Sequence, residues 1–391
     1  MARTKTKFKV FKGKGKDKTK MRGMDTVLFN MILVLLCFGL IMCFSASAPA
    51  AQQNMNGDSY YFLRKQLIWA IVGFAGMLAA SKYDYHKLQK LTFPMVVLSF
   101  VLLIAVLFFP AQKGGRRWIS LPGISFQPSE FVKFTVIVLF ANMLSRKKWH
   151  KVKNVQEFFK YFMKDFCPYM LVFLLFALLL MLEPHFSCTV LILCVVMTML
   201  FAAGANLGYF ATIVGPVIAA GVALVSFGYR SDRITSYLDP FANPRGDGWQ
   251  IIQSLYAIGS GGLFGLGLGQ SRQKFLWLPE PYNDFIFAVL CEELGFIGAA
   301  AVLILFCVLI WRGIYVAMRA PDTFGTFVAV GITALIAFQV LINIAVVTKA
   351  IPVTGMPLPF FSSGGTALLF TLCEMGVLLN ISRQIEVPEA K

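Results

Sequence analysis

Long apolar segments recur from one end of the chain to the other, and they constrain its fold more than any other feature. A helix that spans a bilayer needs roughly 20 mostly apolar residues. Ten segments of about this length are separated by polar or proline-rich stretches. They lie at approximately 26–48, 66–81, 91–110, 129–145, 167–183, 186–203, 207–228, 284–311, 323–347 and 362–381. The sequence therefore predicts an all-α polytopic integral membrane protein with about ten transmembrane helices.

The composition supports a membrane location and excludes several other classes of protein. Hydrophobic residues make up 58% of the 391 residues and charged residues only 14%, whereas a soluble domain is nearer half apolar and a quarter charged. The eight cysteines form no Cys-x-x-Cys pair, and the three histidines are far apart. A secreted disulfide-bonded module, a disordered regulator and an ordinary cytosolic enzyme are therefore excluded, and no histidine-rich metal motif is present.

The net charge of +17 is concentrated in two clusters. Residues 1–22 hold ten Lys and Arg against one acid, and residues 146–165 hold seven against two. Both clusters adjoin long apolar runs, so we interpret them as charges that set orientation and attract anionic lipid. Nucleic-acid binding is disfavoured because no groove-reading motif accompanies them. The positive-inside rule then places both termini in the cytoplasm.

This orientation defines the parts of the chain. Residues 1–25 are predicted to form a disordered basic cytoplasmic tail, 26–383 a single transmembrane domain and 384–391 a short cytoplasmic tail. The first apolar segment ends at a stretch resembling a signal-peptide cleavage site, but the long basic region before it favours an uncleaved helix. The outer connections are 49–65, 111–128, 229–283 and 348–361. The third, between predicted helices 7 and 8, is a large extracytoplasmic loop.

Asp284 is the leading candidate for catalysis. An ionisable residue at membrane depth is costly and therefore suggests a functional site. Asp284 follows Pro279 and Pro281 and stands where the next apolar helix is expected to start, near Asn283. It could cap that helix by accepting backbone N–H bonds, or it could act as a catalytic base at the outer mouth of the bundle. The two interpretations are compatible.

Other charged pairs lie within or beside apolar segments. Glu130 and Lys133 share one helix face at i, i+3, and they either neutralise each other or line a polar cavity open to the outside. Glu292 and Glu293 are expected to be structural partners of a buried Arg or Lys. The irregular segment 352–366 contains three prolines and supports an outward-facing polar cavity, because irregular backbone near membrane depth must be buried or line a cavity.

Two further outer segments admit two interpretations each. Arg116 and Arg117 beside Trp118 suit phosphate recognition, because arginine offers paired donors in a fixed fork. They equally suit anchoring at the membrane interface. The glycine run 259–269 matches loose dinucleotide-binding patterns, but no strand precedes it, so that function is excluded. A glycine-rich amphipathic or re-entrant loop at the outer leaflet is expected instead.

Together these motifs resemble the SEDS family, whose name stands for shape, elongation, division and sporulation. The resemblance covers nearly the whole chain after the basic tail, and segment 261–274 is most similar to the FtsW/SpoVE branch rather than to RodA. The matching stretches are Gly115–Ile119, Phe126–Glu130 with Lys133, Arg230 and Arg233 through Tyr237–Pro240, Gly246–Gln250, Gly261–Lys274, Leu278–Glu280, Asp284–Ala288, Glu292–Gly295 and Pro357–Phe360.

The resemblance implies an inverting glycosyltransferase that polymerises lipid II at the outer leaflet of the bacterial cytoplasmic membrane, in septal division or sporulation. The family's catalytic aspartate falls on Asp284, which as general base would take the proton from the C4 hydroxyl of the acceptor sugar. That oxygen attacks the anomeric carbon of the donor, and undecaprenyl pyrophosphate leaves. No organic cofactor is expected, whereas Mg²⁺ or Mn²⁺ is a candidate for stabilising the pyrophosphate.

The resemblance and the local motifs together select the residues expected to bind the substrate. They carry charge or hydrogen-bonding groups, or they shape the loops on the outer side. The candidates are Arg116, Arg117, Trp118, Gln127, Ser129, Glu130, Lys133, Arg230, Arg233, Ser271, Lys274, Glu280, Ser362 and Gly364. The implied partners are a class B penicillin-binding protein, which would supply cross-linking, and other division or sporulation membrane proteins. No nucleic acid is expected.

Four departures from the family pattern concern outer segments. Asn283 stands where members commonly have Thr, His185 where many have Asp, Lys349 where many have Gly, and Ser363 where many have Tyr. None removes Asp284, but they leave open how the last outer loop contributes. Two other functions also stay open: a flippase for the lipid-linked precursor, and a scaffold without catalytic activity.

Overall fold

The structure is a computed structural model. It describes residues 19–21, 23–111, 115–121, 124–150, 154–213, 215, 237–244, 246 and 248–388. Arg230 and Arg233 lie outside the described residues, as does most of predicted segment 207–228, of which residues 207–213 are helical. The large outer loop is described from residue 237 onward, with two single-residue gaps at positions 245 and 247.

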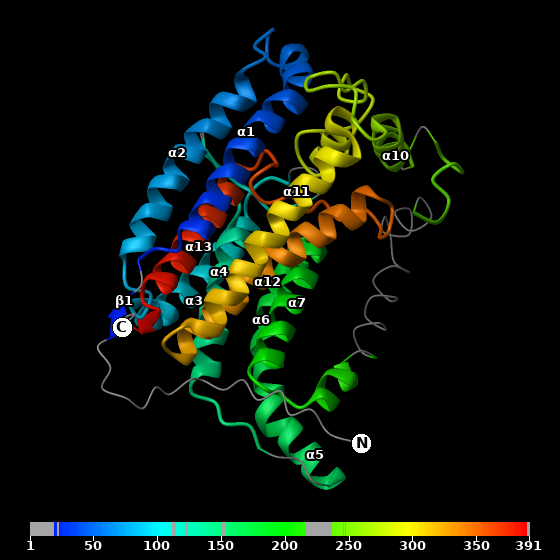
Figure 1. Cartoon of the computed structure of the whole chain (residues 1–391). Helices are drawn as coiled ribbons and strands as arrows, with labels where there is room; N and C mark the ends of the chain where they lie inside the picture. The colour runs from blue at the N-terminus through cyan, green and yellow to red at the C-terminus, as the bar shows by residue number, and fades with distance from the viewer. Residues whose placement is uncertain are drawn as a thin grey trace, which may run out of the picture.

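Long helices dominate the molecule (Figure 1). They are α1 (Thr26–Asn54), α2 (Tyr61–Lys82), α3 (Lys87–Val106), α4 (Pro128–Ser145), α5 (Val155–Tyr161), α6 (Cys167–Leu182), α7 (Phe186–Ala202), α10 (Trp249–Gly261), α11 (Ile286–Arg319), α12 (Thr323–Val347) and α13 (Gly365–Arg383). A π-helical turn, Phe162–Phe166, joins α5 to α6. Eight spans among the described residues are long and apolar enough to cross a membrane, and α7 is a shorter apolar helix.

Every predicted segment except 207–228 coincides with one of these helices, which confirms the polytopic all-α class. The count of ten stays a prediction, because that one segment lies mostly outside the described residues. The largest boundary difference is at the end of α11, which continues eight residues beyond the predicted Trp311 to Arg319. Arg312 did not stop the helix, because its guanidinium pairs with Asp25 and stacks 4.5 Å from the Tyr315 ring.

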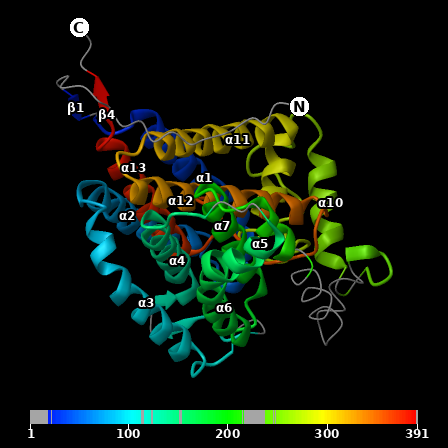
Figure 2. The same ribbon diagram turned by 90° about the horizontal axis from the view of Figure 1, so that it is seen from below.

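Helix α13 lies at the centre of the bundle. It packs along α2 and also contacts α1, α4, α11 and α12. Small residues permit the close α2–α13 approach: a Cβ on Gly376 would lie 2.4 Å from the Met77 carbonyl oxygen, and one on Gly73 would lie 2.7 Å from Leu372. Seen from below, α12 lies between α11 and the pair α4 and α7 (Figure 2).

Two short antiparallel ladders accompany the helices. Strands β1 (Thr19–Met21) and β4 (Glu386–Pro388) pair with Lys20 opposite Val387, at the end of the bundle opposite the α1–α2 connection (Figure 1). Strands β2 (Ile119–Leu121) and β3 (Ile124–Phe126) form a hairpin with Ser120 opposite Ser125. This second hairpin leads directly into α4. The sequence did not predict either ladder.

Candidate active site

Asp284 lies in a turn immediately before α11. The turn is closed by the backbone N–H of Asn283, which donates to the Glu280 carbonyl at 3.0 Å. The helix begins at Ile286 with Phe285 as its N-cap, so the expectation that Asp284 caps the helix is wrong. The reason is that the chain is still turning at Tyr282–Phe285 when the apolar run starts. The half-buried Asp284 carboxylate is therefore presented outside the helix.

The backbone around Asp284 is held by side chains from distant parts of the chain. Asn343 of α12 donates from Nδ2 to the carbonyl oxygens of Asp284 and Met356, both at 2.8 Å. Ser362 donates from Oγ to the Asn283 carbonyl at 2.7 Å and accepts the N–H of Leu358 at 2.8 Å. These contacts fix the backbone of the turn that carries Asp284, which is the arrangement expected around a preorganised catalytic group.

The irregular segment between α12 and α13 connects Asp284 with the start of α7. Gly355 has φ +72°, and a Cβ built on it would lie 3.4 Å from Asp284 Oδ2. One residue earlier, the Thr354 carbonyl accepts a hydrogen bond from Ser187 Oγ of α7. The glycine therefore lets the segment run close beside the carboxylate. The same segment is tied to the start of α7 by the Ser187–Thr354 hydrogen bond.

The start of α4 contributes a buried ion pair. Lys133 Nζ lies 2.7 Å from Glu130 Oε2, and both side chains are almost fully buried. This confirms the intrahelical pair, and the carboxylate of Glu374 on α13 also acts electrostatically on Lys133. Ser129 is buried in the same turn, and Gln127 is the half-buried N-cap. Lining of a cavity by these residues stays a prediction.

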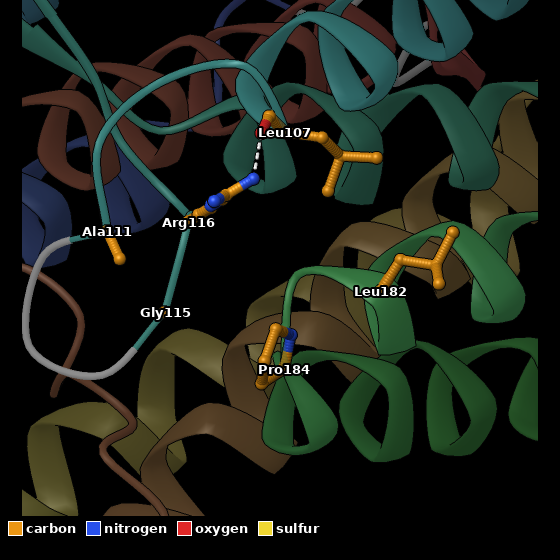
Figure 3. A pocket seen from close by; sticks show the side chains of 6 residues that line it. All are labelled: Leu107, Ala111, Gly115, Arg116, Leu182 and Pro184. Atoms are coloured by element: carbon orange, nitrogen blue, oxygen red, sulfur yellow. Dashed lines mark hydrogen bonds between the residues drawn. The ribbon is translucent and has the colours of Figure 1, made fainter.

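Arg116 and Arg117 point to different partners. Arg117 donates from Nε to the Glu183 carbonyl at 3.2 Å and from Nη2 to the Pro184 carbonyl. Arg116 donates from Nη1 to the Leu107 carbonyl at 2.8 Å. Arg117 thus secures the turn between α6 and α7, while the exposed Arg116 bonds to the end of α3 (Figure 3). Trp118, which follows the two arginines and precedes β2, is half-buried.

Two titratable groups are buried in the α6–α7 turn next to Arg117. Glu183, which follows the last residue of α6, is fully buried, and no described residue hydrogen-bonds its carboxylate oxygens. Burial raises the pKa of the Glu183 carboxyl to about 8, although the Arg117 charge opposes this. Burial, with the charges of Arg117 and Lys133, lowers the pKa of His185 to about 3. Both side chains are therefore mostly uncharged near neutral pH.

The raised pKa of Glu183 predicts a pH-dependent stability. The folded state keeps a proton up to about pH 8, whereas the unfolded carboxyl loses it near its ordinary value of 4.5. Stability is therefore full below about pH 4.5 and falls as the pH rises towards 8. We expect Glu183→Gln to flatten this decline, measured as thermal unfolding midpoints of the purified protein between pH 5 and 9. An unchanged pH profile in the variant would show that Glu183 is ionised when folded.

Ser271 and Lys274 belong to an internal network at the glycine-rich segment. Lys274 Nζ lies 2.8 Å from Glu293 Oε1, 2.7 Å from the Gly269 carbonyl and 3.1 Å from Ser45 Oγ of α1. Ser45 Oγ donates to the same Glu293 carboxylate at 2.7 Å. The expectation that Glu292 and Glu293 include a partner for a buried cation is confirmed.

Glu292 anchors the neighbouring residues of the same segment. Its carboxylate accepts the Ser271 hydroxyl and the backbone N–H groups of Arg272 at 3.0 Å and Gln273 at 3.3 Å. These donors satisfy the hydrogen-bonding capacity of the buried carboxylate. The two candidate substrate-binding residues Ser271 and Lys274 thus have internal partners, and their role towards substrate stays a prediction.

A break in α11 receives the glycine-rich segment. Gly295 has φ +65°, and a Cβ there would lie 2.3 Å from the Gly265 nitrogen. The carbonyls of Glu292 and Glu293, which lose helical partners at the break, accept the N–H groups of Leu266 and Gly267 at 2.9 Å. Glycine is required because backbone meets backbone. The segment thus docks onto a broken helix, a more specific arrangement than the expected loop at the leaflet.

The structure locates the remaining candidates and departures. Glu280, with a carboxylate oxygen 2.8 Å from Asn283 Nδ2, braces the turn before Asp284, and Gly364 is the N-cap of α13. Lys349 has φ +57°, a conformation that favours glycine, which explains why family members often carry glycine there. Ser363 donates its N–H to the Tyr282 carbonyl at 2.8 Å. Both departures therefore lie in the segment that supports Asp284.

The described part of the chain shows no cluster of protein ligands for a divalent cation. Among the described residues, no group of three or more His, Cys, Asp or Glu side chains is placed to hold a metal ion. The buried carboxylates are instead engaged with lysine, serine and backbone donors, as for Glu130 and Glu293, or lie protonated beside Arg117, as for Glu183. The divalent cation suggested for the pyrophosphate therefore stays a prediction.

Asn343 is the functional candidate that sequence reasoning did not place at the site. It is almost fully buried in α12 and makes two hydrogen bonds to the Asp284 turn and the segment after α12. The only signal was an amide within an otherwise apolar segment. That signal cannot identify the partner, because Asp284 and Asn343 lie 59 residues apart in the chain.

Known proteins resemble this chain over nearly its whole length. The model of the family described as cell cycle protein, FtsW/RodA/SpoVE, matches residues 25–386. Stage V sporulation protein E of Bacillus subtilis is 46% identical over 369 residues, covering 93% of this chain and 98% of the relative. A probable peptidoglycan glycosyltransferase FtsW of Geobacter sp. M18 is 41% identical over 372 residues, covering 94% and 98%.

Solved structures share the fold. The Rod shape determining protein RodA of Thermus thermophilus matches with a TM-score of 0.67 at 25% identity, over 92% of this chain and 97% of that chain. A chain from a structure of a peptidoglycan synthase complex that coordinates polymerization and crosslinking matches with a TM-score of 0.71 at 24% identity, over 92% and 98%. On the extent of these matches, the chain belongs to the FtsW/RodA/SpoVE cell cycle protein family, which is the SEDS family.

Proposed function

We propose that this chain is a peptidoglycan glycosyltransferase that polymerises lipid II, with Asp284 as its general base. The observation that carries the proposal is the clamped Asp284 turn, because Asn343 and Ser362 hold its backbone and leave the carboxylate outside α11. Relatives of similar length are named as probable peptidoglycan glycosyltransferases. A fixed, half-buried carboxylate at a helix mouth is suited to accept a proton from a sugar hydroxyl.

In the proposed reaction, Asp284 takes the proton of the acceptor's C4 hydroxyl as that oxygen attacks the donor's anomeric carbon. The bond to undecaprenyl pyrophosphate breaks, and the configuration at the anomeric carbon inverts. A pyrophosphate is already a good leaving group, so a single carboxylate can suffice. Lys133, which Glu130 holds at the start of α4, supplies a buried positive charge, and we assign it to the leaving group.

Location and partners follow from the same proposal. The basic cluster 146–165 and the 19–21/386–388 strand pair lie at the end of the bundle that we assign to the cytoplasm. Asp284 is then extracytoplasmic, where lipid II is presented. A class B penicillin-binding protein is the proposed partner, because a structure with the same fold comes from a synthase complex that coordinates polymerization and crosslinking. The septum is the proposed site of action.

Polymerisation of purified lipid II tests the function directly. The protein is purified alone and together with a class B penicillin-binding protein whose transpeptidase serine is mutated. Glycan strands separated on a gel are the expected product. Absence of strands in the presence of the correct partner would overturn the proposal and favour a flippase or a scaffold.

A further inference from the structure

Gln66 is a buried amide on a helix that otherwise exposes apolar side chains. The buried positions of α2 form one stripe and are Gln66, Ala70, Gly73, Met77 and Ser81, and α2 packs along α13 (Figure 1). The neighbouring Leu67 and Ile68 are exposed, as expected for side chains that meet lipid. A polar side chain at membrane depth is costly unless it is hydrogen-bonded, and Gln66 therefore suggests a role beyond packing.

The amide of Gln66 reaches the irregular segment between α12 and α13. Its Nε2 donates to the Ser362 carbonyl at 3.1 Å. The hydroxyl of the same Ser362 donates to the Asn283 carbonyl at 2.7 Å, one residue before Asp284. Two hydrogen bonds through a single serine thus connect α2 to the turn that carries Asp284.

A second contact between α2 and this turn lies one helical turn earlier. The ring centroids of Phe62 and Tyr282 are 4.5 Å apart, and the Tyr282 carbonyl accepts the N–H of Ser363 at 2.8 Å. Phe62 and Gln66 are spaced i, i+4 and share one face of α2. Helix α2 therefore contacts the turn directly through Phe62 and indirectly through Gln66, while Asn343 of α12 holds the Asp284 carbonyl.

We propose that Gln66 is a positioning residue for Asp284. Its amide fixes the Ser362 carbonyl, so that the Ser362 hydroxyl stays directed at the Asn283 carbonyl and the turn keeps one conformation. Proton transfer requires the base within hydrogen-bond reach of the reacting hydroxyl, so a turn that samples other conformations slows the reaction. The catalytic role of the carboxylate rests on the proposed function, whereas the ordering of the turn by Gln66 does not.

Gln66→Met tests the proposal, because it removes the amide and keeps an unbranched side chain of similar volume. Asn380→Leu is the matched control. Asn380 is a buried amide of α13 whose Nδ2 donates to the Ser81 carbonyl at 2.8 Å. Ser81 follows Gln66 by fifteen residues on α2, which is roughly 22 Å along the helix axis. The control therefore removes an equivalent bond far from the Asp284 turn.

Hydrogen–deuterium exchange of the full chain in detergent, measured by mass spectrometry, reports the order of the turn without any activity. The amides of Asn283 and Ser363 donate within the turn and between the turn and Ser363. We expect peptides containing them to exchange about fivefold faster in Gln66→Met than in wild type, because local opening becomes easier. In Asn380→Leu the same peptides should exchange like those of wild type.

Polymerisation of lipid II then separates positioning from general destabilisation. Well below the unfolding midpoint of each variant, Gln66→Met should lower kcat by about tenfold and leave KM nearly unchanged. Asn380→Leu should keep the wild-type kcat even where its unfolding midpoint falls as far. Adding Gln66→Met to Ser362→Ala should lower kcat no further than Ser362→Ala alone, because both residues act through one hydrogen-bonded chain.

The outcomes distinguish this inference from the proposed function. Unchanged exchange at Asn283 and Ser363 in Gln66→Met would overturn the inference, as would losses of kcat that multiply in the double variant. Faster exchange without a loss of kcat would also overturn it, because the turn would then be ordered to no effect on Asp284. Faster exchange in a protein whose wild type makes no glycan strands would support the ordering of the turn by Gln66 and overturn the proposed function alone.

Discussion

Asp284→Asn is expected to reduce glycan polymerisation by about 10²- to 10⁴-fold, the usual contribution of a general base. The amide keeps the size of the side chain but cannot accept the proton of the attacking hydroxyl. The backbone of the turn should be kept, because the Asp284 carbonyl that accepts from Asn343 is unchanged in the variant. The measurement is the initial rate of lipid II consumption by wild type and variant, each with the same partner protein.

Asp58→Asn is the matched control for this experiment. Asp58 lies on the connection between α1 and α2, and its carboxylate pairs with the exposed Arg64. The variant therefore removes one carboxylate from the same end of the bundle as Asp284. Its polymerisation rate should stay within a factor of about two of wild type, since exposed ion pairs contribute little. If Asp284→Asn polymerises as fast as Asp58→Asn, Asp284 is not the base.

Glu293→Leu is expected to destabilise the protein by about 3–5 kcal/mol, the cost of leaving a buried charge without its partner. Lys274 is almost fully buried and lies 2.8 Å from Glu293, and Ser45 loses its acceptor in the same variant. The docking of the glycine-rich segment onto the break of α11 depends on this network. The measurement is the thermal unfolding midpoint in detergent, together with the fraction of monodisperse protein on size-exclusion chromatography.

The double variant Lys274→Met/Glu293→Leu is the control for loss of charge pairing. Replacing both partners with apolar residues of similar volume removes the uncompensated lysine and should recover most of the lost stability. A double variant no more stable than Glu293→Leu would contradict the ion-pair explanation. The stability would then depend on the Glu293 side chain itself, through Ser45 and the Ser271 N–H.

Hydropathy was sufficient to locate the membrane helices. Segments such as 323–347 and 129–145 coincide with α12 and α4 almost to the residue, because about 20 apolar residues have no other stable arrangement in lipid. Boundaries failed where a polar residue has a tertiary partner. The predicted helix ended before Arg312, whereas α11 continues past it because Arg312 pairs with Asp25. The same helix was predicted to begin at Asp284, whereas α11 begins at Ile286, after a turn.

The sequence predicted only part of the candidate site. The i, i+3 spacing predicted the Glu130–Lys133 pair, because that contact is local. The adjacent arginines suited either phosphate recognition or anchoring at the interface, and the structure separates them, because Arg117 bonds to the α6–α7 turn while Arg116 bonds to the Leu107 carbonyl. The sequence predicted that Glu292 and Glu293 would meet a buried cation, but it did not identify Lys274 as the partner of Glu293. Residue type alone does not reveal which buried charges pair.

By itself, the sequence determined the class of the protein, its helices and the motifs that carry its family membership. Those properties depend on local hydrophobicity and on short runs of residues, both of which can be recognised without knowing the tertiary contacts. Only the tertiary structure decided that Asn343 and Ser362 clamp the Asp284 turn, that the glycine-rich segment fills a break in α11, and that Arg117 secures the α6–α7 turn. Each of these is a contact between residues far apart in sequence, and packing of the folded bundle selects such partners.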